Sequence, residues 1–322
     1  MSTLKALIDA ALLRRQPLLK DASTNAYRLF NGAGDGLDGL IIERFDEVMI
    51  VQLHEQRLNY SDEDLRAAIE SLHQRLGTRA VYKKFFLRDR GDVPPEIAAL
   101  HHAPAPWIGQ PVSPEISILE NGLRFIISPY HGFSVGLFLE HRENRRRIRE
   151  LSPNRWVLNT FCYTGSFSVA AVAGGAASVT SVDLSKTYLA WCRQNFTTNH
   201  LETEGHWFFC SDVLEFFQRA RRQNRRYDLI ILDPPSFGRL RRPARVFVLA
   251  EQLDDLVRQA VERLDPGGIV LLAVNHRQIS RTRLEEALAA TGRPCSILER
   301  PVLPLDFAGD PDYAKSVIAR FD

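Results

Sequence analysis

The chain has 322 residues, of which 45% are apolar and 25% charged, and its formal net charge at pH 7 is +2. This length allows two domains with buried cores, and the composition is that of an ordinary soluble globular protein. No apolar run approaches the roughly 18 residues of a membrane span, and the N-terminus lacks the apolar stretch and cleavage site of a signal peptide. We therefore expect a cytoplasmic protein without a membrane segment.

The four cysteines are widely spaced, at Cys162, Cys192, Cys210 and Cys295. Without a C-x-x-C pair they predict neither a disulfide framework nor a zinc site. We expect buried free thiols and no metal.

Arginine supplies 35 of the 41 basic residues, and it clusters at 142–149, 219–226 and 239–245. Arginine binds phosphate in a bidentate manner, so these clusters are typical of a nucleic-acid interface. Arginine also exceeds lysine throughout the chain, as genome base composition would produce, and the clusters would then be solvated faces. The sequence leaves both interpretations open.

The first 134 residues combine a few helices with hairpin-like strands. Apolar residues at helical spacing predict a helix within residues 1–25. The elements predicted after it are a β-hairpin over 26–54 (turn 31–36, strands 39–44 and 48–53), a helix at 61–76, a strand at 80–86, an irregular Pro-rich linker at 93–114 and a second hairpin at 115–128. The second hairpin has a strong turn signal in Asn121-Gly122.

From about residue 135 helices alternate with apolar strands, which indicates a parallel, doubly wound α/β sheet. The predicted helices are 139–151, 166–175, 186–200, 212–223, 247–264 and 280–291. The predicted strands are 156–161, 178–183, 206–210, 228–232 and 268–274. We accordingly divide the chain into an N-terminal helix (1–25), an α+β substrate-recognition domain (26–114), a β-hairpin connection (115–134) and a larger α/β domain (135–322).

Polar residues follow four successive strands of the larger domain. The first strand ends in a tight turn with Gly165, and the others end at Asp183, at Ser211-Asp212 and at Asp233. Carboxyl ends of parallel strands share one edge of a sheet, where Asp183 could accept the hydroxyls of a ribose and Asp212 an adenine amino group. Asp183 and Asp212 could each be a helix N-cap, but the ordered set favours a nucleoside-type ligand.

The first turn argues against a dinucleotide. It contains a single glycine, Gly165, which follows the bulky Phe161 and Tyr163. Binding of a pyrophosphate requires the pattern G-x-G-x-x-G. Such a turn suits a ligand without phosphates, such as S-adenosylmethionine.

Residues 229–237 read Leu-Ile-Ile-Leu-Asp-Pro-Pro-Ser-Phe. The apolar run predicts a buried strand, which the two prolines end abruptly. Because prolines fix φ and lack an N–H, the carbonyls of Asp233 and Pro234 would form a rigid acceptor array, with Phe237 placed to stack on a base. Taken alone, the segment could be simply a strand with a Pro-Pro stop.

With these motifs the chain resembles the class I S-adenosylmethionine-dependent methyltransferases, specifically the branch of bacterial 23S ribosomal-RNA methyltransferases. The resemblance covers about residues 26–320. It rests on Arg28-Leu-Phe-Asn-Gly-Ala-Gly-Asp-Gly-Leu-Asp-Gly-Leu, Gly136-Leu-Phe-Leu-Glu-His-Arg-Glu-Asn-Arg-Arg, Leu158-Asn-Thr-Phe-Cys-Tyr-Thr-Gly-Ser-Phe, Ser181-Val-Asp-Leu-Ser, Asp233-Pro-Pro-Ser-Phe and Asp312-Tyr-Ala-Lys315. Relatives often begin with an RNA-binding PUA domain, for which the residues before position 26 are too few, so we expect a PUA-less member.

The resemblance implies a Rossmann-like methyltransferase sheet and an S-adenosylmethionine site. The cofactor-binding residues would be Phe138, Arg142, Asn159, Thr160, Phe161, Cys162, Tyr163, Thr164, Gly165, Asp183, Leu184, Ser185, Ser211, Asp212, Val213 and Asp233. Asp233, Pro234, Phe237 and His276 would act at the methyl-transfer site, and Pro235, Ser236 and Asn275 would contact the substrate.

Relatives that methylate carbon 5 of cytosine carry a catalytic cysteine after the fifth strand, where this chain has Asn275-His276. Carbon 5 becomes nucleophilic only after a thiolate adds to the ring, so this reaction is disfavoured. His276 could hydrogen-bond the base or remove a proton, or be a packing histidine at a strand end.

Three functions remain open from the sequence. The first is a methyltransferase for a base nitrogen of ribosomal RNA, guanine N7 or an exocyclic amine, acting on a single-stranded or flipped base. The second is a methyltransferase for a small molecule or a protein side chain. The third is a non-catalytic module that has kept the cofactor fold. The two-part arrangement would also allow a homodimer.

Overall fold

The computed structural model describes residues 3–54, 60–87, 94–241 and 244–322. Contacts divide the chain into two compact units. Unit 1 contains residues 1–140 and a returning segment, 304–310, and unit 2 contains 141–303 and 311–322. The sequence pattern had suggested a boundary near 134 and gave no sign of the return. Among the described helices, none has the length and apolar character needed to cross a membrane.

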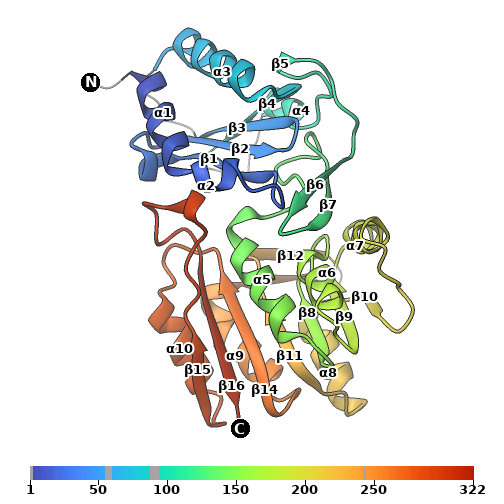
Figure 1. The fold of residues 1–322 in the computed structure, drawn as a ribbon. Helices are drawn as coiled ribbons and strands as arrows, with labels where there is room; N and C mark the ends of the chain where they lie inside the picture. The colour runs from blue at the N-terminus through green and yellow to red at the C-terminus, as the bar shows by residue number, and fades with distance from the viewer. Residues whose placement is uncertain (1–2, 55–59, 88–93, 242–243) are drawn as a thin grey trace. The chain divides into compact units, whose positions relative to one another are not determined.

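Unit 1 is built on a five-stranded sheet whose strands follow chain order. The strands are β1 (Ala26–Asn31), β2 (Leu40–Phe45), β3 (Val48–His54), β4 (Ala80–Phe86) and β5 (Ile108–Gly109). Helices α1 (Leu4–Arg14) and α3 (Asp62–Leu76) cover one face, where their apolar side chains join those of the strands in one core (Figure 1). The shorter helices of this unit are α2 (Gln16–Leu19), α4 (Pro95–Leu100), η1 (Gly32–Asp35) and, on the returning segment, η3 (Leu305–Phe307).

Two expectations for unit 1 were wrong. Residues 26–31 form a third strand beside the predicted hairpin; all six are buried, so the strand lacks the alternating pattern that marks a half-exposed strand. The stretch 93–114 is not a linker: it contains α4 and β5, and the Trp107 N–H donates to the Val81 carbonyl at 2.8 Å. Residue 93 itself lies outside the described residues.

The second hairpin is confirmed. It consists of β6 (Ile116–Glu120) and β7 (Leu123–Ile127), which pair in antiparallel fashion. Its turn residues Asn121 and Gly122 have φ angles of 50° and 77°, the left-handed values that make this dipeptide a hairpin signal.

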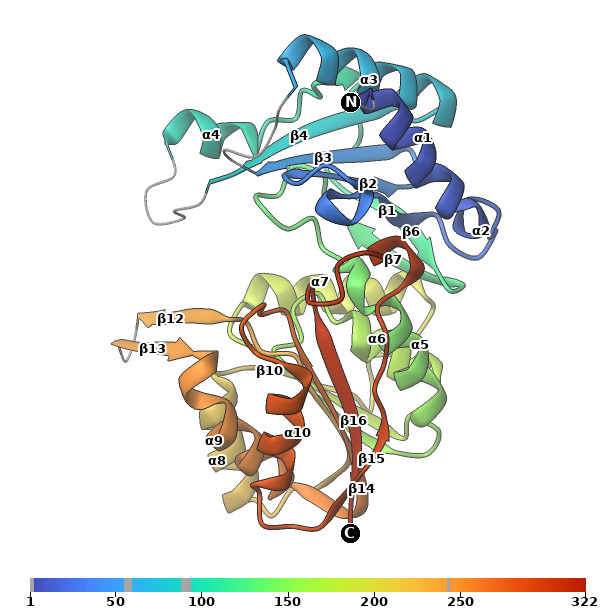
Figure 2. The same ribbon diagram turned by 90° about the vertical axis from the view of Figure 1, so that its left-hand side faces the viewer.

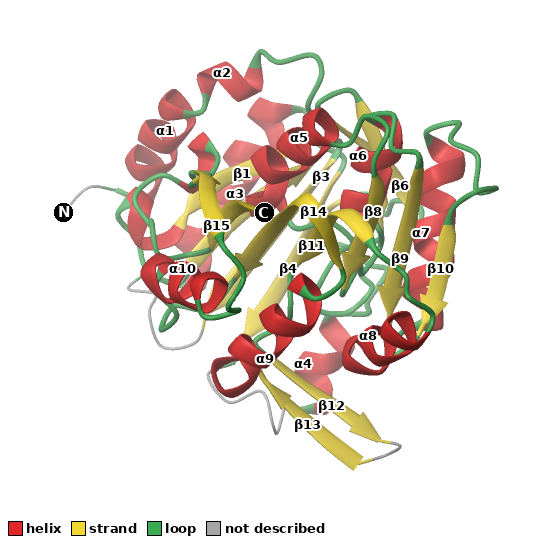
Figure 3. Cartoon of the chain, turned by 90° about the horizontal axis from the view of Figure 1, so that it is seen from below, coloured by secondary structure: helices red, strands yellow, loops and turns green. Residues whose placement is uncertain are grey.

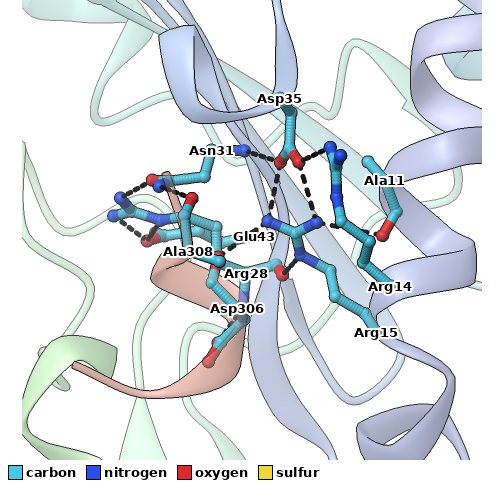
Figure 4. A network of polar contacts seen from close by, with 9 residues as sticks. All are labelled: Ala11, Arg14, Arg15, Arg28, Asn31, Asp35, Glu43, Asp306 and Ala308. Carbon is cyan, nitrogen blue, oxygen red and sulfur yellow. Dashed lines mark hydrogen bonds and ion pairs between the residues drawn. The ribbon is translucent and has the colours of Figure 1, made fainter. Parts of the chain in front are cut away.

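A buried network of charged groups holds the returning segment in unit 1 (Figure 4). The Arg15 side chain is 1% exposed, pairs with Asp35 at 2.6 Å and donates to the Asp306 carbonyl at 2.7 Å. The Arg28 backbone N–H donates to the Asp306 carboxylate at 2.8 Å. The Arg28 guanidinium pairs with Glu43 at 2.7 Å. Each buried charge therefore has a partner, as burial requires.

Removing one member of this network should destabilise the fold. We expect Asp35→Ala to lower the free energy of unfolding by about 3–5 kcal/mol, because it leaves the Arg15 guanidinium buried without its carboxylate. Asp9→Ala removes the partner of Arg75 in an exposed pair and should cost about 0–1 kcal/mol. Denaturant unfolding of the two variants tests this; equal losses would contradict the structural role of the network.

Unit 2 contains a seven-stranded sheet in the order β10-β9-β8-β11-β14-β16-β15. In chain order its strands are β8 (Trp156–Thr160), β9 (Ser178–Asp183), β10 (Trp207–Cys210), β11 (Tyr227–Leu232), β14 (Leu264–Val274), β15 (Cys295–Glu299) and β16 (Lys315–Phe321). The first five are parallel to one another, and β16 is antiparallel to both its neighbours. This confirms the predicted doubly wound α/β fold.

Helices cover both faces of the sheet (Figure 2). Apolar residues of α8 (Val213–Arg222), α9 (Leu249–Val261) and α10 (Arg281–Ala289) form the core on one face. Residues of α5 (Arg142–Leu151) and α6 (Ser166–Ala173) form the core on the other. The helix α7 (Lys186–Thr198) packs against α6 and β9, and a short helix, η2 (Leu139–His141), precedes α5.

Three features of unit 2 were not predicted. A hairpin of β12 (Phe237–Arg241) and β13 (Ala244–Val248) follows the Asp-Pro-Pro segment and lies beside α9 (Figure 3). Strands β15 and β16 complete the sheet near the C-terminus. The helix predicted to start at 247 starts at Leu249, because residues 244–248 belong to the hairpin.

Candidate active site

The register of the parallel strands brings the predicted polar residues to one edge of the sheet. Thr160 of β8 pairs with Val182 of β9 and with Leu232 of β11. The next residue of each neighbouring strand, Asp183 and Asp233, therefore lies in the row just beyond these pairs. At this point helices diverge to opposite faces on the two sides of β8, which is where open α/β sheets bind ligands.

The turn after β8 is held in a strained conformation. Phe161, Tyr163 and Gly165 all have positive φ, at 51°, 50° and 78°. The Cys162 N–H donates to the Val182 carbonyl at 3.0 Å, and the Tyr163 N–H donates to the Asp183 carboxylate at 2.9 Å. Such strain occurs where a ligand must be approached closely, and here the hydrogen bonds to β9 maintain it.

The side chains of Asn159, Thr160 and Thr164 are buried inside this turn. Asn159 donates to Ser168 at 2.9 Å and Thr160 donates to the Ile231 carbonyl at 2.8 Å. The Thr164 carbonyl accepts from Asn195. These residues can therefore meet a cofactor through their backbone, while their side chains fix the turn.

Asp183 has a carboxylate ready to accept ribose hydroxyls. Its two oxygens accept from the Tyr163 and Ser185 N–H groups, at 2.9 and 2.8 Å, and retain further lone pairs. Burial raises the pKa of Asp183, and the backbone donors at Ser185 and Tyr163 oppose this effect. The next residue, Leu184, is 51% exposed and offers an apolar surface beside the carboxylate.

Asp212 is the N-cap of α8, and its carboxylate accepts from the Glu215 N–H at 3.0 Å. Ser211 is tied to the same edge because its N–H donates to the Asp183 carbonyl at 3.0 Å. The Val213 side chain lies in the core, so its backbone N–H, in the first turn of α8, is the group that could meet an adenine. The N-cap role considered for Asp212 is thus confirmed.

The Asp-Pro-Pro segment meets the end of β14. Asp233 has a side chain 23% exposed, and its Oδ2 lies 3.3 Å from His141 Nε2. Ser236 donates to the Asn275 carbonyl at 3.0 Å, which links the two predicted substrate segments. Pro234 is buried, whereas Pro235, Ser236 and Asn275 are exposed, and Phe237 is 51% exposed.

His276 is half-buried, and its Nδ1 has no hydrogen-bond partner among the residues that the structure describes. Its carbonyl is one of three that surround the Lys315 ammonium, with those of Arg277 and Asp312, at 3.0–3.3 Å. Lys315 is buried and thereby fixes the loop after β14. The motif Asp312-Tyr-Ala-Lys315 is apparent in the sequence, whereas this function of Lys315 is not.

Two predicted cofactor residues precede α5 or begin it. Phe138, in unit 1, is 42% exposed, and Arg142, the first residue of α5, is 2% exposed. Sequence reasoning missed His141 between them, although its contact with Asp233 is a direct one. The only signal for His141 in the sequence was its residue type, because histidine often pairs with a catalytic carboxylate.

The arginine clusters differ from one another. In the first, Arg146 and Arg147 pair with glutamates of the same helix and Arg145 is buried, so this cluster is mainly structural. In the second, Arg219, Arg221, Arg222 and Arg226 are exposed. They lie before β11 begins, at the edge of the sheet opposite to Asp233. The side chains of the third cluster, 239–245, lie outside the described residues.

The turn should not tolerate a side chain at position 165. A Cβ on Gly165 would lie 2.0 Å from Cys192 Sγ, and φ is 78°. We expect Gly165→Ala to cost about 2–4 kcal/mol of unfolding free energy through overpacking and strain, and to weaken cofactor binding. Gly205→Ala, at φ 79° with no atom within 4 Å, should cost about 1 kcal/mol and leave binding unchanged. Thermal unfolding and calorimetry test the pair; equal effects would exclude the steric explanation.

Cofactor affinity should depend on the charge of Asp183. In the predicted role of Asp183, ribose hydroxyls donate to its ionised carboxylate, and burial raises the pKa of that carboxylate. Lowering the pH through that raised pKa should therefore weaken binding, at a higher pH than for an ordinary aspartate. Asp183→Asn should bind S-adenosylmethionine about tenfold to a hundredfold more weakly at neutral pH and lose this pH dependence.

Calorimetric titrations from neutral to acidic pH measure this effect. Asp228→Asn, at the opposite end of β11, is the matched control and should keep the pH dependence of the natural protein. A pH dependence that persists in Asp183→Asn would contradict the assignment.

Comparison with known proteins gives the same family throughout. The family model described as "S-adenosylmethionine-dependent methyltransferase" matches residues 27–320. A protein of Deinococcus radiodurans named "Ribosomal RNA large subunit methyltransferase" is 33% identical over 98% of this chain and 78% of its own length. "Ribosomal RNA large subunit methyltransferase I" of Aeromonas salmonicida is 29% identical over 88% of this chain and 70% of its own.

A solved structure extends the likeness to three dimensions. SMU.776, classed as a methyltransferase and solved in complex with SAH, superposes with a TM-score of 0.85 at 28% identity. The match covers 98% of this chain and 80% of that one. The strand-edge geometry, the family match and this likeness agree: the chain belongs to the S-adenosylmethionine-dependent methyltransferases, and its cofactor is S-adenosylmethionine.

Proposed function

We propose that this enzyme methylates a base nitrogen of large-subunit ribosomal RNA, and that an exocyclic amine is the target its acceptors fit best. The names of two similar proteins, from Deinococcus radiodurans and Aeromonas salmonicida, support the RNA substrate. Such a substrate would place the enzyme in the cytoplasm.

The acceptor array around Asp233 is the observation that carries the proposal. Asp233 Oδ1 makes no hydrogen bond with any residue that the structure describes, while Oδ2 faces His141. Pro234 and Pro235 have no N–H, so this segment offers acceptors and no donors of its own at those positions. An amine with two N–H donors suits such a site. Guanine N7, which has no proton, would use it less directly.

The surrounding residues fit the cofactor. The edge offers the N–H groups of the first turn of α6, the Asp183 carboxylate and the exposed Leu184, which match an amino-acid carboxylate, a ribose and an adenine ring. S-adenosylmethionine supplies an electrophilic sulfonium methyl group.

The chain's own residues then orient the nucleophile. Asp233 would accept an amine N–H, and the exposed ring of Phe237 would stack on the base, so that the nitrogen lone pair faces the methyl group at near-attack distance. The carbon–nitrogen bond forms as the carbon–sulfur bond breaks, and the nitrogen then loses a proton to water or to Asp233. A base within a duplex could not enter, so the target would be single-stranded or flipped.

The cysteines do not favour the cytosine-C5 reaction. Cys162 and Cys192 are buried, and burial raises the pKa of the Cys162 thiol, which disfavours a nucleophilic thiolate. Cys210 ends β10 and Cys295 begins β15, whereas the loop after β14 holds Asn275 and His276. A nitrogen target needs no covalent step.

The proposal predicts one missing modified nucleoside in ribosomal RNA from a strain without the gene, detected by mass spectrometry. Purified enzyme should restore it using S-adenosylmethionine. Asp233→Asn should lower kcat about a hundredfold, because an amide replaces the acceptor carboxylate. Asp228→Asn, on β11, the strand that Asp233 follows, is the control and should act normally. Unchanged nucleosides, with labelled methyl appearing in a metabolite or protein fraction, would overturn RNA as substrate and favour the second hypothesis.

A further inference from the structure

We infer that His141 is a positioning residue that holds the Asp233 carboxylate through the contact of its Nε2 with Oδ2, and that hydrogen bonds from α5 and β16 fix the imidazole in turn. The inference rests on the proposed role of Asp233 as the acceptor for the target amine. His141 precedes the first residue of α5 and is 3% exposed, and its Nε2 lies 3.3 Å from Asp233 Oδ2.

The protonation of His141 follows from its second contact. Asn144, also on α5, donates from Nδ2 to His141 Nδ1 at 3.0 Å. Because Nδ1 accepts, the neutral ring carries its proton on Nε2, the nitrogen that faces Asp233 Oδ2. The imidazole therefore presents its N–H to the carboxylate from a fixed place.

Asn144 is itself held by Ser316 of β16. Its Nδ2 donates to Ser316 Oγ at 2.9 Å, and the hydroxyl lies 3.3 Å from its Oδ1. With one N–H on His141 and the other on Ser316, the amide has a single orientation in the relay. All three side chains are buried, so water does not compete for these contacts.

The strand register explains why these groups meet. Leu232 pairs with Leu272, which pairs with Val317, so Ser316 lies one residue beyond this row, at the edge where Asp233 lies. Alternation along the strands also places Ser316 on the face of Ile318, the face that α5 covers. The relay thus connects the helix α5 and the sheet strand β16 to the Asp233 segment.

The consequence is an asymmetric carboxylate. His141 engages Oδ2, so Oδ1 is the oxygen left for the target amine. A carboxylate free to rotate would present either oxygen at variable angles, and misplacement by about 1 Å can cost about a hundredfold in rate. His141 acts on Asp233 and does not itself need to touch the substrate.

Two substitutions of similar chemistry separate this role from packing. In His141→Gln the amide nitrogen reaches about as far as Nε2 and can donate to Asp233. In His141→Asn it reaches only as far as Nδ1. With ribosomal RNA from a strain lacking the gene, we expect His141→Asn to lower kcat about tenfold to a hundredfold and His141→Gln to stay within about threefold of the natural enzyme.

Affinity for S-adenosylmethionine should stay within about twofold in both variants, as measured by calorimetry. Equal losses of kcat in the two variants, no loss in either, or a parallel loss of cofactor affinity would overturn the inference. The last result would indicate that the contact of His141 with the Phe167 ring, 5.6 Å between centroids, is what matters.

A measurement without turnover separates this inference from the proposed function. Nitrogen-15 spectra of the full chain, labelled at histidine and bound to S-adenosylmethionine, should show the Nε2–H tautomer at His141, identified by the signal lost in His141→Gln. Asn144→Leu should produce a mixture of tautomers. An Nδ1–H or doubly protonated ring in the natural protein would refute the relay. The expected tautomer without any methylation of ribosomal RNA would refute the proposed function alone.

Discussion

The parallel register of β9, β8 and β11 is the constraint on which the rest of the site depends. It aligns Val182, Thr160 and Leu232 in one row, and the carboxylates of Asp183 and Asp233 follow one residue beyond that row. Because helices leave β8 and its neighbours toward opposite faces, the space above this row is open to a ligand. A slip of one residue in either pair would turn Asp183 or Asp233 to the other face of the sheet.

The protein uses buried polar contacts wherever a segment must be held without a regular element. In unit 2, the Asp183 carboxylate holds the strained turn through Tyr163. The Lys315 ammonium donates to two carbonyls of the loop after β14 and to the Asp312 carbonyl just before β16. In unit 1, Arg15 and Asp306 hold the returning segment. Each contact replaces the hydrogen bonds that an irregular backbone would otherwise make with water, which is why burying these charges is tolerable.

Much of the fold could be predicted because it rests on local patterns. The alternation of helices and apolar strands after residue 135 gave the doubly wound sheet, and Asn121-Gly122 gave the second hairpin. Local patterns failed where pairing partners decide the structure. The strand Ala26–Asn31 is buried on both faces, and the helix predicted from residue 247 overlaps the end of the hairpin strand Ala244–Val248. The sequence left the role of the arginine clusters open, and the structure shows that Arg146 and Arg147 of the first cluster pair with Glu150 on the same helix.

The sequence by itself determined the chemistry of the strand ends: which carboxylates follow which strands, that prolines remove donors after Asp233, and that one glycine, Gly165, stands in the turn after β8. These are properties of residue type and spacing, so they can be read before folding. The tertiary structure alone decided which oxygen of Asp233 faces His141, because that depends on His141, Asn144 and Ser316, which come from two separate elements. Hydrogen bonds between residues as far apart as Asn144 and Ser316 require the register of the whole sheet, and no local pattern encodes it.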